Sequence, residues 1–157
     1  MTLSPPEPGV PQGQLGLVRA TSEDFDAIYQ LCEATMRGYV EADLGDCFEG
    51  VARKTLADLI ARQLFSKIYR GEAFVGALAF EEHASHYQLE ELYIAPAYQN
   101  AGLGGVIVRD VMAQAGARRK PVRLHVLASN RAKAFYERLG FAVTRTTRQV
   151  NFLEWAA

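Results

Sequence analysis

Three features are scarce in this 157-residue sequence: long apolar runs, cysteine, and an excess of charge of either sign. No apolar run approaches the ~18 residues that a membrane helix needs, so a membrane partner is not expected. The 17 Lys and Arg residues nearly balance the 18 Asp and Glu residues, which leaves a net charge of −1. Non-specific binding to nucleic acid therefore has no electrostatic support.

Cysteine occurs only at Cys32 and Cys47. Their separation fits no metal-binding or redox motif, so no metal is expected, and a reduced, cytoplasmic setting is the simplest interpretation. The N-terminus lacks the basic and apolar regions of a signal peptide. Proline is rare after residue 14, because four of the six prolines lie before it. We expect residues 1–14 to be a disordered leader and residues 15–157 to form one domain.

The ordered part alternates strand and helix patterns. Period-2 and apolar runs predict strands at Leu15–Arg19, Leu64–Arg70, Ala73–Phe80, Tyr87–Ala95, Pro121–Leu127, Phe141–Thr147 and Gln149–Trp155. A capping box at Thr21–Asp24 opens a first helix, Gly45 and Gly50 bracket a loop, and further helices are predicted at Val51–Gln63, Leu103–Gly116 and Asn130–Leu139. Gly140 is predicted to end the last helix in a left-handed conformation. This order predicts a mixed α/β domain.

The stretch from Leu89 to Gly105 is the most informative part of the chain. A strand-like run meets Pro96, then a Gly-rich turn, then a long amphipathic helix. Such a turn leaves several backbone N–H groups unpaired at a helix N-terminus, which is an anion site commonly used by phosphate. No Lys-Ser or Lys-Thr follows the turn and no Gly-x-Gly-x-x-Gly is present, which excludes a P-loop and a dinucleotide fingerprint.

Two motifs carry a resemblance to a known family. The turn Gln99-x-x-Gly102-x-Gly104 resembles the Gln/Arg-x-x-Gly-x-Gly/Ala signature of the GCN5-related N-acetyltransferases (GNAT). The segment 122–130 is similar to the fifth strand of that family. Residues 132–141 then resemble its Ala-x-x-x-Tyr-Glu-x-Leu-Gly-Phe segment. The element order matches from about residue 15 to residue 155.

The resemblance implies a mixed, mostly antiparallel sheet of six to seven strands, splayed between two neighbours and flanked by four helices. It also implies acetyl-CoA as the co-substrate of an N-acetyltransferase. Carried over by position, the backbone of Leu92, Tyr93 and Ile94 pairs with the pantetheine arm. The residues expected to hold the pyrophosphate are Gln99, Asn100, Ala101, Gly102, Leu103, Gly104 and Gly105.

The same resemblance implies two further contacts. Asn130 is expected near the thioester, although a one-residue difference in spacing leaves Ser129 as the alternative. Tyr136 is expected to donate a proton to the departing thiolate and to contact the cofactor. An alternative function from another class, a non-catalytic acyl-CoA-binding or scaffold domain, would keep the glycine turn without needing Tyr136.

The base that accepts the proton of the amine stays open among three residues. His125 has the reference pKa closest to neutral pH, roughly 6.5. Glu90 and Glu91 lie on the preceding strand, where alternation predicts that they point to opposite faces. We take His125 and Glu90 as the candidate catalytic residues beside Tyr136. Because neither cysteine falls within the motifs, the amine is expected to attack directly, without a covalent enzyme intermediate.

The acceptor side is less defined. The segment 38–52 contains four acidic residues and no Lys or Arg, so it is predicted to be an acidic loop that attracts an ammonium group. Tyr39, Phe48 and Tyr93 are candidates for an apolar wall. A cationic small amine or a peptide N-terminus is the expected acceptor. The closing strand 149–155 is apolar, and two alternatives stay open for it: an exposed edge that pairs across a homodimer, or a strand that the domain's own helices cover.

Overall fold

The computed structural model describes residues 14–157, so the predicted Pro-rich leader lies, apart from Gln14, outside the described residues. The strands are β1 (Leu15–Arg19), β2 (Phe65–Arg70), β3 (Ala73–Glu82), β4 (Tyr87–Ile94), β5 (Val122–Leu127), β6 (Ala142–Thr146) and β7 (Val150–Trp155). The helices are α1 (Phe25–Leu44), α2 (Phe48–Ala61), α3 (Leu103–Ala117) and α4 (Ala132–Arg138), with short 3₁₀ turns at Ser22–Asp24 and Pro96–Tyr98.

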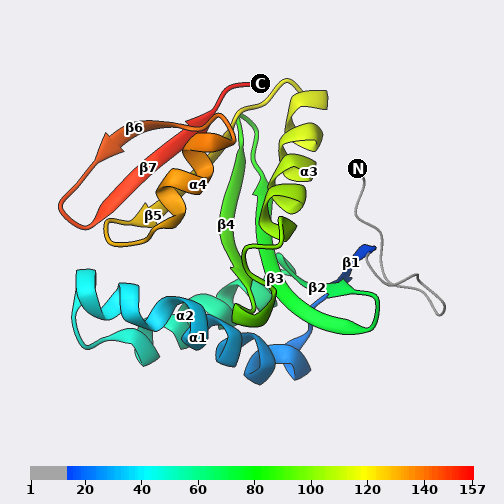
Figure 1. Cartoon of the computed structure of the whole chain (residues 1–157), viewed down its shortest axis with the longest axis vertical. Helices are drawn as coiled ribbons and strands as arrows, with labels where there is room; N and C mark the ends of the chain where they lie inside the picture. Colours follow the sequence, from blue (N-terminus) through cyan, green and yellow to red (C-terminus); the bar gives the residue numbers. More distant parts are fainter. Residues whose placement is uncertain (1–13) are drawn as a thin grey trace.

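The seven strands form one sheet in the order β1-β2-β3-β4-β5-β7-β6. Every neighbouring pair is antiparallel except β4 and β5, which run parallel. The predicted mixed, mostly antiparallel sheet with four helices is confirmed. Figure 1 shows β4 and β5 starting together and then diverging toward the side where α1 and α2 lie.

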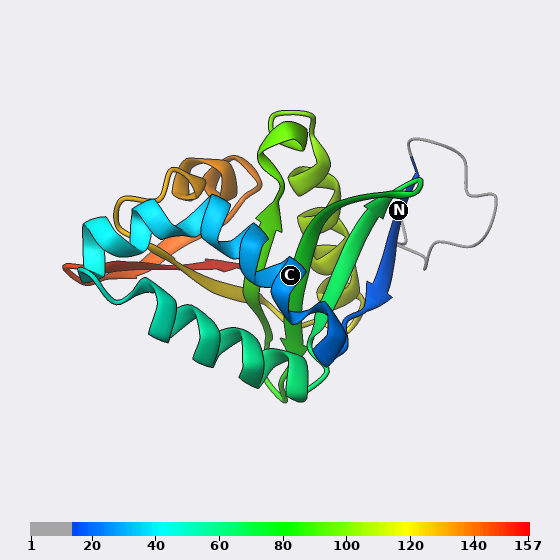
Figure 2. The ribbon, with the colours of Figure 1, turned by 90° about the horizontal axis from the view of Figure 1, so that it is seen from below.

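The helices cover the two faces of the sheet in pairs, as Figure 2 shows. One core cluster joins the sheet to α3 and α4, with Ile107, Val111 and Tyr136 among its buried members. The other cluster joins the sheet to α1 and α2 through residues such as Ile28, Phe48 and Leu56. Each face therefore has its own core, and the diverging strands lie between the two.

Several local predictions are confirmed. The backbone N–H of Thr21 donates to the Asp24 carboxylate at 2.9 Å, which completes the capping box before α1. Gly71 lies in the two-residue turn between β2 and β3 with φ +60°. Gly140 follows α4 with φ +104°, the left-handed conformation expected there.

Two predictions are wrong. The loop predicted between Gly45 and Gly50 is shorter than expected. It comprises only residues 45–47, because α2 begins at Phe48 and includes Gly50. Phe48 is buried against α1, and this tertiary contact starts the helix earlier than the local sequence indicates. Of the two alternatives for the closing strand, the exposed edge is wrong: β7 lies between β5 and β6, and β6, with all five residues exposed, forms that edge.

Candidate functional site

The site begins where β4 and β5 separate. The two strands pair only at Tyr87 with Val122 and Gln88 with Arg123, so the β5-facing edge of β4 has no strand partner beyond Gln88. A β-bulge lies immediately after this point, because Ala79 pairs with Glu91 whereas Phe80 pairs with Leu89. Glu90 is therefore an extra residue in β4. Bulges bend a strand and increase its twist, which favours the separation from β5.

A cavity of about 420 Å³ lies in this opening, within the range of small-molecule sites. α1 and α2 form one wall, and the diverging halves of β4 and β5 form another. The start of α4 contributes Asn130, Ala132 and Tyr136. The cavity thus joins the two faces of the sheet at its splayed point.

Glu90 and Glu91 both line this cavity on the side of α1 and α2. The Glu90 carboxylate lies within 4.8 Å of Glu81, which is ion-paired to Arg62 just after α2. Glu91 adjoins Tyr93 and Cys32 of α1. The prediction that the two glutamates point to opposite faces is wrong, because the bulge interrupts strand alternation.

The Glu91 carboxyl is the most perturbed acid of the cavity. Desolvation raises its pKa to about 7; the Tyr93 hydroxyl opposes this shift, and the negative charge of Glu90 adds to it. The pKa of Tyr93 is raised in turn by burial and by Glu91. Burial also raises the pKa of the Cys32 thiol to about 11, which keeps it protonated and unreactive at neutral pH. Among the groups of the cavity whose pKa is shifted, Glu91 is the one that can change protonation near pH 7.

Tyr136 lies on the far side of the cavity, on α4. Its ring packs edge-on against Phe135 and Phe141, with centroids 5.0 and 5.5 Å apart. Burial, aided by the charge of Glu91, raises the pKa of its hydroxyl well above the usual value for tyrosine. The hydroxyl therefore holds its proton at neutral pH.

His125 lies on β5 and also lines the cavity, but its side chain is exposed. Its ring tilts against Phe152 of β7 at a centroid distance of 5.8 Å. The structure thus brings all three predicted catalytic residues, Tyr136, His125 and Glu90, to one cavity. It adds Glu91, which is partly buried beside Tyr93 and Cys32.

The glycine turn leads into α3 at the other end of β4. Asn100 and Gly102 both have positive φ, at +62° and +81°. Val106 donates the first bond of the helix, to the Gly102 carbonyl. The amides of Leu103, Gly104 and Gly105 precede that bond, and no side chain of the described residues caps them. The turn has the backbone geometry expected of an anion site.

Two contacts fix the turn in place. The Gln99 side-chain amide donates to the Ile94 carbonyl at 2.9 Å, so this side chain fastens the turn to the end of β4. A Cβ on Gly104 would lie 3.3 Å from the Phe135 ring, which shows that α3 and α4 approach each other closely there. The glycine turn is therefore held next to the helix that carries Tyr136.

Asn130 and Ser129 occupy different environments. Asn130 lines the cavity, and its side-chain oxygen accepts a bond from the Ala132 amide at 2.9 Å, at the start of α4. Ser129 points to α1, where its amide and hydroxyl both donate to the Asp43 carboxylate, at 2.8 and 2.6 Å. The arrangement favours Asn130 over Ser129 as the residue that contacts a ligand.

The predicted acidic loop is largely helical, and most of its charges have local partners. Glu41 pairs with Arg37, Glu49 pairs with Arg53, and Asp43 accepts the two bonds from Ser129. These contacts weaken the negative field that the sequence suggested. Phe48 and Tyr93 line the cavity as predicted, whereas Tyr39 is not among its lining residues.

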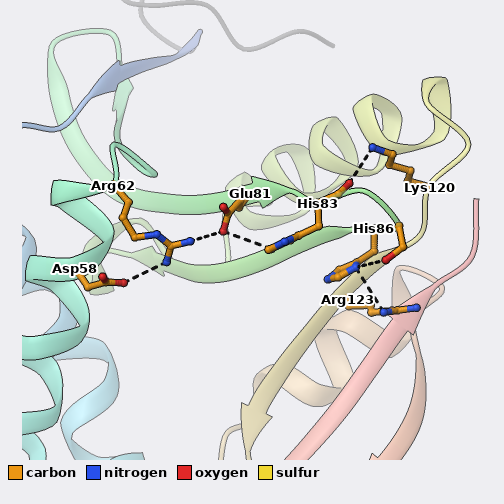
Figure 3. Close-up of polar contacts among 8 residues, drawn as sticks. Asp58, Arg62, Glu81, His83, His86, Lys120 and Arg123 are labelled. Carbon is orange, nitrogen blue, oxygen red and sulfur yellow. Dashed lines mark hydrogen bonds and ion pairs between the residues drawn. The ribbon is translucent and has the colours of Figure 1, made fainter.

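A polar chain leads from Glu90 to the protein surface. Glu81, His83 and Glu90 hold their ligand-type atoms within 4.8 Å of one another. Figure 3 shows that Glu81 is already shared between Arg62, at 2.6 Å, and His83, at 3.4 Å. His83 stacks on His86 with centroids 4.8 Å apart. The arginine supplies the positive charge that Glu81 needs, so ion pairing accounts for the group.

The sequence left four residues of functional interest without a clear role. Glu91 was one of three candidates for the base, and Cys32 was considered only for metal or redox chemistry. Asp43 was placed in a loop. Gly76 of β3 was missed, although a Cβ there would lie 2.3 Å from the Tyr93 carbonyl oxygen. The apolar spacing of α1 hints at Cys32 facing inward, but the contacts of the other three depend on strand pairing and helix docking.

Comparisons with known proteins agree with this geometry. A family model described as an acetyltransferase (GNAT) domain matches residues 37–156. Among curated proteins, no sequence matches this chain. No helix of the described residues is long and apolar enough to cross a membrane.

Solved structures with the same fold are distant in sequence. The PaiA N-acetyltransferase from Thermoplasma acidophilum, in complex with coenzyme A, is 17% identical with a TM-score of 0.76, covering 92% of this chain and 99% of that one. Arabidopsis thaliana Naa50, with the bisubstrate analogue CoA-Ac-MVNAL, is 18% identical with a TM-score of 0.67, over 91% and 99%. The ribosomal-protein-S18-alanine N-acetyltransferase from Escherichia coli is 19% identical with a TM-score of 0.68, over 91% and 94%.

The family match spans most of the described chain, and it includes the splayed strands, the glycine turn and the segment with Tyr136. The chain belongs to the GNAT acetyltransferase family.

Proposed function

We propose that the protein is an acetyl-CoA-dependent N-acetyltransferase that moves an acetyl group to a primary amine by direct attack. The observation that carries this proposal is the placement of Glu91 and Tyr136 on one cavity, in the opening between β4 and β5. One group can accept a proton near pH 7 and the other retains one. The glycine turn at the N-terminus of α3 lies beside the same helix, α4.

The backbone of this region suits coenzyme A. The amides of Leu103, Gly104 and Gly105 would hold the pyrophosphate at the positive end of α3, together with the preceding residues Asn100, Ala101 and Gly102. Leu92, Tyr93 and Ile94 lie on the strand edge that β5 leaves free, where an extended pantetheine arm can take the place of a strand. Gln99 holds this turn through its bond to Ile94, and Asn130 faces the cavity.

An attacking amine must lose a proton, because its pKa in water is near 10.4. Glu91, with a pKa of about 7, accepts that proton directly or through water. Acetyl-CoA supplies the acyl carbon, which exchanges its bond to sulfur for a bond to the amine nitrogen. The Tyr136 hydroxyl then donates its proton to the departing thiolate, and the second proton released by the amine nitrogen restores the hydroxyl through water.

Glu91 takes the role of base in this proposal in preference to His125 and Glu90. His125 is exposed and rests against Phe152, so water competes for any proton that it handles. Glu90 adjoins Glu81 and His83, and its charge supports the raised pKa of Glu91. We therefore assign His125 to the cavity wall. Glu90 has the role of supplying negative charge that raises the pKa of Glu91.

The test is thiol release from acetyl-CoA with a panel of amines, for the wild type and Tyr136→Phe. We expect the variant to lose about 10²-fold or more in kcat while coenzyme A binds with unchanged affinity in calorimetry. Unchanged turnover would remove Tyr136 as the acid. Binding of coenzyme A without turnover of any amine would favour the alternative, a non-catalytic acyl-CoA-binding domain.

Two further assignments complete the proposal, a cytoplasmic location and assembly as a homodimer. The location rests on the unpaired cysteines, of which Cys47 is exposed and Cys32 buried. The sheet has edge strands β1 and β6, and we assign the pairing to β6, whose residues are all exposed. Light scattering of the purified protein measures the assembly.

A further inference from the structure

The wall that α1 and α2 give to the cavity is apolar almost throughout. Its side chains include Met36, Val40, Phe48, Ala52 and Leu56. Cys32 and Thr55 are the polar exceptions, and the Cys32 thiol stays uncharged because burial raises its pKa. An occupant of this side therefore meets hydrocarbon along most of its length.

This apolar surface continues out of the cavity. Three large hydrophobic side chains are exposed within residues 14–157: Leu44 at 38%, Val51 at 44% and Val143 at 36%. Leu44 and Val51 lie at the turn between α1 and α2, and both line the cavity. Val143 lies on β6, away from it. Exposed apolar surface thus gathers where an acceptor would enter.

Most of the charges around the entrance are already engaged, and Asp46, exposed in the turn between α1 and α2, is the acidic exception among the described residues. Arg37 binds Glu33 and Glu41 and stacks over the Phe48 ring at 4.7 Å. Arg53 binds Glu49 and stacks over Tyr29 at 4.5 Å. Among the residues that line the cavity, the only carboxylates are those of Glu90 and Glu91, on β4. An acceptor therefore finds one anionic end and an apolar remainder.

We infer that the acceptor is a primary amine with a single positive charge, carried on an apolar body. This inference rests on the proposed acetyltransferase function. The ammonium lies at Glu90 and Glu91, and the body runs along the α1–α2 wall and leaves past Leu44 and Val51. A second positive charge along the body would be desolvated against hydrocarbon without a partner, which is costly.

Two sources supply this chemistry, an alkylamine or arylalkylamine and a peptide with a large apolar first residue. The experiment measures kcat/KM for acetyl-CoA-dependent acetylation of hexylamine, 1,6-diaminohexane, spermidine and peptides that begin with Leu or Asp. We expect kcat/KM for hexylamine to be at least tenfold higher than for 1,6-diaminohexane, which has the same six-carbon chain and a second amine. The Leu peptide should likewise exceed the Asp peptide. The ratio of kcat/KM for the Leu peptide to kcat/KM for hexylamine shows whether a peptide or an alkylamine is the better acceptor.

Val51→Asp tests the entrance itself, and Val143→Asp, a similarly exposed valine on β6, is its matched control. We expect Val51→Asp to lower kcat/KM for hexylamine about tenfold and to reduce the ratio of kcat/KM for hexylamine to that for 1,6-diaminohexane. Val143→Asp should leave kcat/KM and this ratio unchanged. Equal or better use of the diamine or spermidine by the wild type would overturn the inference and leave the proposed function intact. Failure to acetylate any amine would overturn both.

Discussion

The Asp43 carboxylate accepts two hydrogen bonds from Ser129, one from its amide at 2.8 Å and one from its hydroxyl at 2.6 Å. The two residues are 86 positions apart in the sequence. Asp43 lies in the last turn of α1, and Ser129 immediately precedes Asn130 on the cavity wall. The contact therefore fastens the acceptor side of the cavity to the loop between β5 and α4.

We predict that Asp43→Ala loosens this connection. Because the contact lies near the surface, the loss of stability should be about 1 kcal/mol, or a fall of about 2–4 °C in Tm. The KM for the acceptor should rise several-fold, since the α1–α2 wall is no longer held against the loop. Asp46→Ala, an exposed acidic residue of the same turn, is the control. Unchanged Tm and KM in Asp43→Ala would refute the fastening role.

Gly76 allows β3 to approach the end of β4, where it pairs with Ile94. A Cβ on this residue would lie 2.3 Å from the Tyr93 carbonyl oxygen and 3.2 Å from the Ile68 side chain. Because the first of these atoms is backbone, the two strands must move apart. We predict that Gly76→Ala costs about 3 kcal/mol of the free energy of unfolding, measured in urea.

Gly38→Ala is the matched control for this substitution. Gly38 lies within α1, and no atom lies within 4 Å of a Cβ placed on it. Alanine is the better helix former, so this variant should gain up to about 1 kcal/mol. Equal stability of the two alanine variants would show that the backbone at Gly76 tolerates a side chain.

The raised pKa of Glu91 predicts how the rate depends on pH. If Glu91 must be ionised to act as base, kcat/KM should fall below an apparent pKa near 7. Glu90 contributes negative charge, whereas Tyr93, Cys32 and Tyr136 face the same carboxyl uncharged and His125 lies on the opposite strand. Glu90→Gln should therefore move the acidic limb to lower pH, and Glu91→Gln should abolish it. If the acidic limb of the pH profile stays in place in Glu91→Gln, another group is responsible for it.

The same shift has a consequence for stability. The folded state binds a proton on Glu91 more tightly than the unfolded state, whose pKa is near 4.5. Stability should therefore fall as pH rises from about 4.5 to 7 and then level off. A shift of this size corresponds to about 3 kcal/mol at most. Glu91→Gln should be more stable than the wild type at pH 8 and equal to it at pH 4, as measured by urea unfolding.

The strands and helices were largely predictable because their signals are local. β1 follows its alternating run, the capping box precedes α1, and Gly140 ends α4. The start of α2 was not predictable, because Phe48 is drawn into the helix by burial against α1. The position of β7 inside the sheet also depends on pairing with β5, which no local pattern records.

The candidate site was likewise predictable where its signals are local and unpredictable where it depends on tertiary contacts. The motifs identified the glycine turn, Asn130 and Tyr136, which the structure places around one opening. The pairing of Glu90 and Glu91 on one side was missed because a bulge is a mismatch between two strands rather than a property of one. Cys32 lines the cavity because α1 packs beside Tyr93, and this contact cannot be predicted from the local sequence.

The glycine turn offers the sharpest test of coenzyme A binding. Gly102 caps α3 in a left-handed conformation, with φ +81°, which an alanine adopts only at a cost of about 1–2 kcal/mol. A residue that leaves this conformation turns the amides of Leu103 and Gly104 away from their common direction. We predict that Gly102→Ala weakens coenzyme A binding about tenfold in calorimetry.

Gly45→Ala separates this effect from general strain. Gly45 also has positive φ, +89°, and no atom lies within 4 Å of a Cβ on either glycine, but Gly45 ends α1. Gly45→Ala should lose at least as much stability as Gly102→Ala, because ψ −164° places Gly45 in a region that is essentially restricted to glycine, but only Gly102→Ala should lose affinity. If Gly45→Ala weakens coenzyme A binding equally, strain anywhere in the domain suffices, and the α3 amides are not the phosphate ligands. If neither variant changes affinity while both lose stability, the pyrophosphate is held elsewhere.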